Sequence, residues 1–343
     1  MNAFGSVVAK IGLAFAATAA TLLVLEAGLR LGDYEYTPLR IEVVKKWSEW
    51  RYYHAFEDKH FVYDPLLIWR PRKGGEFFNE QGYRGKVISP AKDVGTTRIF
   101  AIGDSNTLGW PGNDAPNWPM YLEQILNNNG HPSVVVNAGV YGYTSFQGLR
   151  RFKEALAFDP DLVLISFGCN DAMRVTMSDA DFASRRVRQR NWDQVLMRAR
   201  IGQLLLAIAD NLPWGEKDHL VPRVSLDEYK ANLEEIIRIS RDRRIRTVLL
   251  TRPFTGPSPT QWWWKNFARE YNDATIATGA HTGVAVVDIY TYFKDCTDCF
   301  VDEAHFTEKG LRQMATLIYD TIRQDLPVSN AVANALAQQV RKP

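Results

Sequence analysis

A serine that directly follows a short apolar run is the first residue in this chain placed to do covalent chemistry. The run Ile99–Ile102 is apolar without a helical period and ends in Gly103-Asp104-Ser105, which indicates a buried strand closed by a turn. Open α/β sheets bind their ligands at the carboxyl ends of such strands. A serine there can act as a nucleophile once a base accepts its proton. Gly-Asp-Ser is also common in ordinary turns, so this block alone identifies no site.

A histidine near the carboxyl end of the chain is the candidate base. His305 lies in the block Val301–Gly310, and Asp302 precedes it by three residues. Histidine exchanges protons near neutral pH, so its imidazole can accept the proton of Ser105. The Asp302 carboxylate is near enough in sequence to hold the imidazole in the required tautomer. These three residue types together predict nucleophilic acyl transfer.

Two further apolar runs end in residues that can donate hydrogen bonds. One leads to Gly142 and the other to Asn170-Asp171. The tetrahedral intermediate of acyl transfer carries an oxyanion that needs donors aimed at it. The backbone N–H groups of Ser105 and Gly142 and the side-chain amide of Asn170 are available at three strand ends. We expect Asp104 and Asp171 to brace their loops rather than to react.

Taken together, the four blocks resemble those of the SGNH (GDSL-type) hydrolase superfamily over about residues 98–325. The residues that match the family's Ser, Gly, Asn and His, with the aspartate of its Asp-x-x-His arrangement, are Ser105, Gly142, Asn170, His305 and Asp302. Gly142 is preferred to Gly139 because it follows Asn137-Ala138 at the family's usual interval. The resemblance implies a flavodoxin-like three-layer α/β/α sandwich. It also implies an esterase or acyltransferase that uses neither metal nor cofactor.

Five apolar runs alternate with helical patterns along the chain. This alternation predicts a five-stranded parallel sheet with helices on both faces. Right-handed crossovers then bring the strand ends, and with them Ser105, Gly142 and Asn170, to one edge of the sheet. Among the helices, Ser145 is expected to cap one at its start. The capping box Ser225-Leu-Asp-Glu228 opens another.

Composition and patterning divide the chain into four parts. The 343 residues are 46% hydrophobic and 23% charged, which suits one large α/β domain with extensions. The predicted parts are a membrane anchor or signal peptide at 1–32, an aromatic-rich adaptor at 33–97, the hydrolase domain at 98–326 with a basic, helical insertion at 172–224, and a tail at 327–343. The adaptor is expected to pack on the catalytic domain, with a membrane-interface or sugar-stacking role as alternatives. The insertion is expected to shape the substrate cleft, with contact to anionic lipid headgroups or recognition of an anionic substrate as alternatives.

The amino-terminal segment is apolar enough to interact with a membrane. Its uncharged run Ile11–Leu25 has 15 residues, about 22 Å as a helix, which is short of a hydrocarbon core of roughly 30 Å. Counting Val7–Leu31, with its few charges reaching the interfaces, gives enough length. An uncleaved single-pass anchor is the favoured interpretation. A signal peptide cleaved near Ala17-Thr18-Ala19 and a buried core helix are the alternatives.

The charged residues that flank the amino-terminal segment do not by themselves determine on which side of the membrane the catalytic domain lies. Basic residues after the segment outnumber those before it, which favours a cytoplasmic catalytic domain. The resemblance to anchored bacterial SGNH proteins implies a periplasmic one. Large domains translocate largely regardless of charge, so we expect the periplasmic arrangement.

The cysteines allow two readings of the loop before His305. Cys296 and Cys299 could close a small disulfide in an oxidising compartment. Together with Asp302 and His305 they could instead hold Zn²⁺. A zinc site would occupy His305, which could then not act as a base. It would also leave the other three blocks unexplained, so we do not favour this hypothesis. The net charge of +2 gives no argument for nucleic acid, and no Walker A or Gly-x-Gly-x-x-Gly sequence is present.

The sequence therefore predicts a membrane-anchored serine acyl hydrolase that acts on O-acyl groups of a carbohydrate or lipid at the cell envelope. One alternative transfers the acyl group to an envelope polysaccharide. Another is a non-catalytic accessory subunit with a membrane protein partner. The expected partners are thus the ester substrate and the membrane, with no nucleic acid.

Overall fold

The computed structural model describes residues 3–34, 58–64, 66–109, 116–175, 177–184, 198–211, 221–254 and 262–327. The chain divides into two compact units, one of residues 1–52 and 184–218 and the other of residues 53–183 and 219–343. Residues 35–57 of the predicted adaptor, much of the basic insertion and nearly all of the predicted tail lie outside the described residues. The four sequence blocks all belong to the second unit.

Five parallel strands form the sheet of the second unit. From one edge to the other their order is β4-β3-β5-β8-β9, and every neighbouring pair is parallel. Numbered along the chain, this is the flavodoxin-like order 2-1-3-4-5, which confirms the predicted fold class. The strands are β3 (Thr97–Gly103), β4 (Ser133–Asn137), β5 (Leu162–Ser166), β8 (Arg246–Leu250) and β9 (Ala285–Val287). The strand order reverses between β3 and β5, where such sheets bind ligands.

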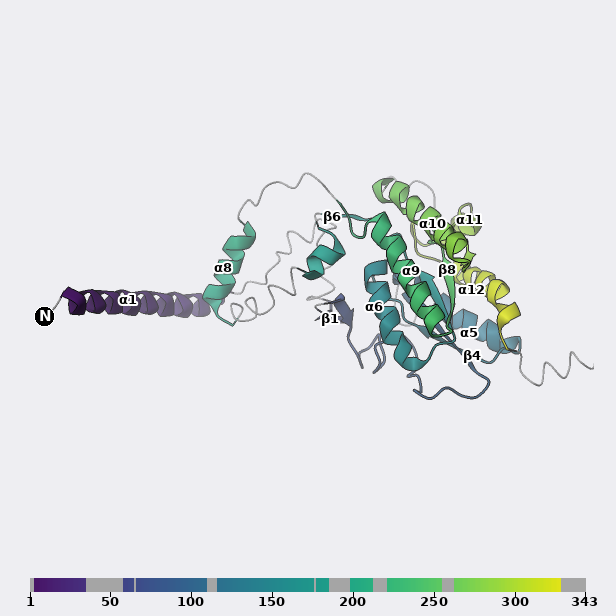
Figure 1. The fold of residues 1–343 in the computed structure, drawn as a ribbon, viewed down its shortest axis with the longest axis horizontal. Helices are drawn as coiled ribbons and strands as arrows, with labels where there is room; N and C mark the ends of the chain where they lie inside the picture. The colour runs from purple at the N-terminus through teal and green to yellow at the C-terminus, as the bar shows by residue number, and fades with distance from the viewer. Residues whose placement is uncertain are drawn as a thin grey trace, which may run out of the picture. The chain divides into compact units, whose positions relative to one another are not determined.

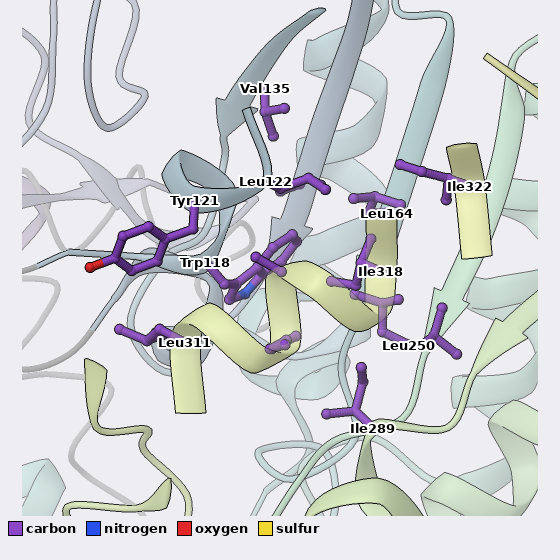
Figure 2. Close-up of a cluster of buried hydrophobic side chains, with 14 of the residues drawn as sticks. Trp118, Tyr121, Leu122, Val135, Leu164, Leu250, Ile289, Leu311, Ile318 and Ile322 are labelled. Carbon is purple, nitrogen blue, oxygen red and sulfur yellow. The ribbon is translucent and has the colours of Figure 1, made fainter. Parts of the chain in front are cut away.

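Two helices and a hydrophobic core cover one face of this sheet. α5 (Trp118–Asn128) and α12 (Glu308–Ile322) pack against each other and against strand side chains (Figure 2). Trp118 and Ile318 are fully buried there. Burying a side chain of the size of Leu or Ile is worth roughly 1.5–3 kcal/mol, so this face holds α12 firmly. Because α12 begins three residues after His305, the core also fixes the position of the histidine loop.

Three helices lie on the other face, side by side in Figure 1. They are α6 (Ser145–Ala155), α9 (Leu226–Asp242) and α10 (Trp262–Thr282). The predicted capping box at the start of α9 is present, with Ser225 and Glu228 bonding reciprocally. The prediction for α6 was wrong by one residue, because Thr144 rather than Ser145 is the cap. Thr144 has the extended backbone of a cap, and its N–H donates to Gln147 Oε1 at 2.9 Å.

The described part of the adaptor packs onto the sheet unit. β1 (Phe61–Asp64) and β2 (Ile68–Pro71) form an antiparallel pair. The fully buried Trp69 donates its indole N–H to the Tyr141 carbonyl at 3.1 Å, and the Tyr143 hydroxyl donates to the Trp69 carbonyl at 2.7 Å. The adaptor is thereby attached to the turn after β4, which also carries Gly142.

Both ends of the predicted insertion belong to the sheet unit. β6 (Arg174–Val175) pairs antiparallel with β7 (Val221–Pro222). Directly after β7, Arg223 forms a buried ion pair with Asp179, with Nη2 and Oδ2 2.9 Å apart. The base of the insertion is therefore closed by a short ladder and a buried charge pair.

The first unit contains two described helices. They are α1 (Ala3–Leu31) and α8 (Arg200–Asn211). Within α1, the 23 residues Ala9–Leu31 are long and apolar enough to cross a membrane. As a helix they measure about 34 Å, against a hydrocarbon core of roughly 30 Å. A signal sequence would meet the same criterion, so length and composition leave both predicted interpretations of this segment open.

Candidate active site

Ser105, His305 and Asp302 lie in one chain of hydrogen bonds. Ser105 Oγ is 2.8 Å from His305 Nε2, and His305 Nδ1 is 2.7 Å from Asp302 Oδ2. The serine and the histidine are 200 residues apart in sequence. With the Nδ1 proton directed at the carboxylate, Nε2 is left to accept the serine proton. This is the geometry of a nucleophile, a base and an orienting carboxylate.

Asp302 is held in position by the backbone of its own loop. Its Oδ1 accepts the Ala304 N–H at 2.9 Å and the His305 N–H at 2.8 Å. Partial burial opposes ionisation of the carboxyl. The hydrogen bond and charge of His305 and the two backbone donors outweigh that burial and lower the pKa of Asp302 to about 2. The group is therefore ionised at neutral pH, as an orienting carboxylate must be.

A tight turn from strand to helix presents the serine. β3 passes through Asp104 directly into α4 (Ser105–Leu108). Asp104 is the N-cap, and its Oδ1 accepts the Asn106 N–H at 2.9 Å. A Cβ at Gly103 would lie 2.8 Å from the Ser166 carbonyl oxygen of the neighbouring strand, so this position requires glycine. The cap leaves the Ser105 N–H at the first position of the helix, where backbone donors have no intrahelical partner.

Asn106 connects α4, which begins with Ser105, to the loop of His305. Its Nδ2 donates to the Ala304 carbonyl at 2.7 Å. Asn106 is buried and the acceptor directly precedes His305, so the contact sets the distance between Ser105 and His305. The sequence did not predict this role of Asn106, because asparagine is common beside turns.

Asn170 bridges the two loops that carry the other expected oxyanion donors. Its Nδ2 donates to Tyr143 O at 3.0 Å and to Asp104 Oδ2 at 3.3 Å. Asp104 directly precedes Ser105, and Tyr143 directly follows Gly142. The amide is thus placed between the serine turn and the glycine turn. Its longer contact, to Asp104, is the one that an incoming oxyanion would most easily replace.

Gly142 has the backbone conformation and the uncommitted donor expected of an oxyanion residue. Its φ is +65°, a left-handed conformation that favours glycine. Among the described residues, no protein acceptor contacts its N–H, whereas the Gly139 N–H donates to Asn137 Oδ1 at 3.1 Å. The Gly142 carbonyl accepts from Arg223 Nη1 at 2.8 Å, which fixes the orientation of this turn. The geometry therefore favours Gly142 over Gly139.

A buried ion pair lies beneath the nucleophile. Arg252 follows β8, and its Nε is 2.9 Å from Asp104 Oδ2. Both side chains are almost completely buried, so each charge depends on the other. The same carboxylate oxygen contacts Asn170, which links the arginine to the expected oxyanion site. We did not predict Arg252 from the sequence, although a charge directly after an apolar strand was a usable signal.

Arg84 holds the other end of the nucleophile's helix. Its Nη1 donates to the Leu108 carbonyl at 2.5 Å and to the Gly109 carbonyl at 2.9 Å. A cation at the carboxyl end of a helix also interacts favourably with the helix dipole. Arg84 lies in the predicted adaptor, and the sequence did not predict a role for it at the site.

Asp171 supports the loop of Asn170 from a fully buried position. Its two carboxylate oxygens accept the Ser145 N–H at 2.8 Å and the Gly168 N–H at 3.0 Å. Burial outweighs these hydrogen bonds and raises the pKa of Asp171 to about 7. Both contacts are to the backbone, in agreement with the expected bracing role.

The two cysteines before the histidine loop are joined. Cys296 and Cys299 form a disulfide with an S–S distance of 1.96 Å. Within the described residues, the one acidic and thiol cluster compact enough for a metal consists of these cysteines and Asp298. That cluster does not include His305, whose two ring nitrogens contact Asp302 and Ser105. The geometry thus gives the zinc alternative no support.

Comparison with known proteins places these residues in a family. The family model of the GDSL-like Lipase/Acylhydrolase family matches residues 101–313. An arylesterase of Vibrio mimicus is 33% identical over 85 residues, which are 24% of this chain and 42% of that protein. Esterase TesA of Pseudomonas aeruginosa is 35% identical over 77 residues, 22% of this chain and 38% of that protein. The chain thus matches less than half the length of these curated relatives.

Solved structures align with about two thirds of this chain. The lipase/acylhydrolase from Enterococcus faecalis aligns with a TM-score of 0.49 and 22% identity, covering 68% of this chain and 99% of that one. An acetylxylan esterase from Geobacillus stearothermophilus aligns with a TM-score of 0.46 and 19% identity, covering 66% and 94%. The family model covers more than half of this chain and includes every residue of the hydrogen-bonded site. The chain therefore belongs to the GDSL-like lipase/acylhydrolase family.

Proposed function

We propose that this protein hydrolyses acyl esters through a covalent intermediate on Ser105. The observation that carries the proposal is the continuous hydrogen-bonded chain from Ser105 through His305 to Asp302. Family membership and the esterase names of the two curated relatives support it. Asn170 and Gly142 border the serine turn, where a substrate carbonyl would be attacked.

The reaction follows from the positions of the protons. Ser105 Oγ attacks the ester carbonyl carbon while His305 Nε2 takes the hydroxyl proton. The carbonyl oxygen becomes an oxyanion, which accepts hydrogen bonds from the N–H groups of Ser105 and Gly142 and from Asn170 Nδ2. Collapse of this intermediate breaks the bond to the alkoxy oxygen, and the imidazolium returns its proton to that leaving group. Water then attacks the acyl-serine with His305 again as the base, and the acid is released.

The ionised Asp302 stabilises the imidazolium in both half-reactions. It keeps Nδ1 protonated and fixes the plane of the ring through its own hydrogen bonds to the loop backbone. The low pKa of Asp302 keeps this carboxylate charged across the neutral range. Asp104 and Asp171 act on the geometry of the donors rather than on protons of the substrate.

We propose that the enzyme is anchored by α1 and acts at the cell envelope, on the periplasmic side. The uncleaved anchor is favoured over a signal peptide because cleavage near Ala19 would leave the exposed, apolar residues Leu22–Leu25 on the mature protein. The Cys296–Cys299 disulfide favours an oxidising compartment. An O-acylated carbohydrate or lipid is the substrate class that such a location offers.

The decisive measurement is hydrolysis of p-nitrophenyl acetate, butyrate and octanoate by the full chain in detergent. Ser105→Ala and His305→Ala should each lower kcat by at least about 10³-fold without loss of the fold. His281→Ala is the matched control, since His281 is exposed and lies outside the site. Serine-independent turnover would contradict the proposal. A folded but inactive protein would favour the accessory-subunit alternative.

The same assay can distinguish transfer of the acyl group to a sugar from hydrolysis by water. The acyl-serine is common to both, and only the acceptor differs. Added oligosaccharide should leave the acid as the main product if water is the acceptor. An acylated sugar formed at the expense of the acid would identify the O-acyltransferase alternative.

A further inference from the structure

We propose that α8 lies on the surface of the bilayer, with its apolar side in the interface between headgroups and acyl chains. The proposal rests on the anchor proposed above and assigns a partner, an anionic phospholipid surface, to part of the basic insertion. α1 and α8 belong to the same unit and contact each other.

A carboxylate on the membrane helix holds the start of α8. Glu26 accepts the Arg200 N–H at 3.1 Å and the Ile201 N–H at 2.9 Å. These are the first two backbone donors of α8, which have no partner inside the helix. Arg30 adds a third donor, with Nε 2.8 Å from Glu26 Oε1. A negative charge at a helix amino terminus is further stabilised by the helix dipole.

The position of Glu26 along α1 sets the depth of this contact. Glu26 lies five residues before Leu31, the last residue of the helix, or about 7.5 Å along its axis. If α1 crosses the bilayer, Glu26 is at the edge of the hydrocarbon region, where an unpaired carboxylate would be costly. The three donors offset the cost of placing the Glu26 charge there, and two of them are backbone N–H groups of α8. The start of α8 must therefore lie at the same depth as Glu26. The amino terminus of α8 is therefore drawn to the membrane surface.

The exposure of α1 supports the same placement. Among the described side chains of residues 9–31, only Glu26 and Leu29 are partly buried, and all others are exposed. Among the described residues, the contact that covers Glu26 comes from the start of α8. Figure 1 shows α8 running across the carboxyl end of α1 rather than alongside it. A helix that crosses the end of a membrane span in this way lies close to the plane of the bilayer.

Among the described side chains of α8, the exposed ones are apolar. Leu205 and Ile208 are 53% and 51% exposed, whereas Gln203 and Ala207 are buried. Residues three positions apart lie on the same side of a helix, so the two exposed side chains form one stripe. In water, a helix is expected to bury its large aliphatic side chains and to expose its polar ones. α8 does the opposite, because it buries Gln203 and exposes Leu205 and Ile208. Acyl chains beside α1 would cover the stripe.

The charges near this contact suit an anionic surface. Arg30 and Arg198 are exposed at the junction of the two helices, close to Arg200. Basic residues next to a membrane helix are attracted to anionic headgroups, each by about 1 kcal/mol near the surface. An apolar stripe together with flanking arginines is typical of an interfacial helix.

The test measures the depth of labels on α8 in membranes. The full chain is reconstituted in vesicles of phosphatidylethanolamine and phosphatidylglycerol, with an environment-sensitive fluorophore on Leu205→Cys or Ile208→Cys. Ala16→Cys in α1 and the exposed Glu234→Cys in α9 serve as references for the bilayer interior and for water. The α8 labels should be quenched best by a nitroxide placed near the lipid headgroups. Aqueous iodide should quench them several-fold less than the Glu234 label.

The outcomes separate this inference from the anchor itself. If the Ala16 label is deep while both α8 labels are as open to iodide as the Glu234 label, the anchor stands and the interfacial helix is wrong. If the Ala16 label is also in water, the anchor and the inference fall together. Glu26→Leu should raise iodide quenching at Leu205→Cys, and Glu26→Gln, which keeps one acceptor oxygen, should raise it less. Unchanged quenching in Glu26→Leu would contradict the role of Glu26.

Discussion

At the scale of single residues, the site combines a partly exposed chain of candidate catalytic residues with buried charges that hold it in place. The His305 and Asp302 side chains are 22% and 47% exposed, so a substrate and water can reach them. Beneath them, the pairs Arg252–Asp104 and Arg223–Asp179 are almost fully buried. Removing one member of such a pair typically costs about 3–5 kcal/mol, because the other charge is left uncompensated. These pairs therefore act through geometry rather than chemistry.

Asn170→Ala tests the proposed oxyanion donor. Loss of one such donor typically lowers kcat by about 10²- to 10³-fold with a smaller effect on KM, because the interaction forms mainly in the transition state. Steady-state kinetics with p-nitrophenyl acetate would measure it, beside a melting curve to confirm folding. Unchanged turnover in a folded variant would remove Asn170 from the site.

The pKa of Asp171 predicts a pH dependence of stability. Its carboxyl would ionise near pH 4 when unfolded, but burial raises the folded pKa to about 7. Between these values the folded state binds more protons, so the free energy of unfolding should fall as the pH rises from 4 to 7. The contribution is on the order of 4 kcal/mol. Denaturant unfolding across this range should show a flatter profile in Asp171→Asn. Parallel profiles would show that Asp171 does not titrate there.

At the scale of elements, short segments from distant parts of the chain meet at α4. The Asp104 cap and Asn106 fix its start, and Arg84 binds its carboxyl end. A four-residue helix has little stability of its own, because nucleation is costly and few of its hydrogen bonds are internal. The precise position of Ser105 therefore depends on contacts from outside the helix.

Arg84→Met should lower kcat more than it raises KM. Without the guanidinium, the carbonyls of Leu108 and Gly109 lose their donor and α4 can shift. A displacement of about 1 Å at a catalytic group costs up to about 10²-fold in rate. Arg84→Lys should recover part of the rate, since an ammonium can still bind one carbonyl. The neighbouring, exposed Lys86→Met is the control. Equal kcat in Arg84→Met and Lys86→Met would leave Arg84 without a positioning role.

At the scale of the whole molecule, the chain consists of the sheet unit and of the first unit, which contains a candidate membrane span. The apolar surface of α1 is exposed along almost its whole length, which is unfavourable in water and expected in lipid. Glu26 of α1 contacts the start of α8, and we propose that α1 is retained as a membrane anchor.

Retention of the amino terminus follows from that arrangement. The protein purified from membranes should keep Ala17-Thr18-Ala19 intact and should resist extraction by alkaline carbonate. Amino-terminal sequencing or peptide mass analysis would establish the first residue. A mature chain that begins after Ala19 would identify a signal peptide and overturn the anchor.

The sequence alone determined the fold class and the residues of the hydrogen-bonded chain. Ser105, Asn170 and the glycine turn each end an apolar run, and strand ends of a parallel sheet meet at one edge whatever lies between them. His305 and Asp302 were found because their spacing is local. These predictions depend on patterns among residues that are close together in the sequence, so they require no knowledge of the tertiary structure.

The tertiary structure alone decided which distant side chains support the site. Three arginines, Arg84, Arg223 and Arg252, each bind a carbonyl or carboxylate tens to hundreds of residues away. The sequence around an arginine does not show whether its side chain is solvated or buried. The contact between Glu26 and the start of α8 could not be predicted either, because backbone N–H groups are present at a helix start whatever the residue type. Such contacts arise only when folding brings the groups together and removes water from around them.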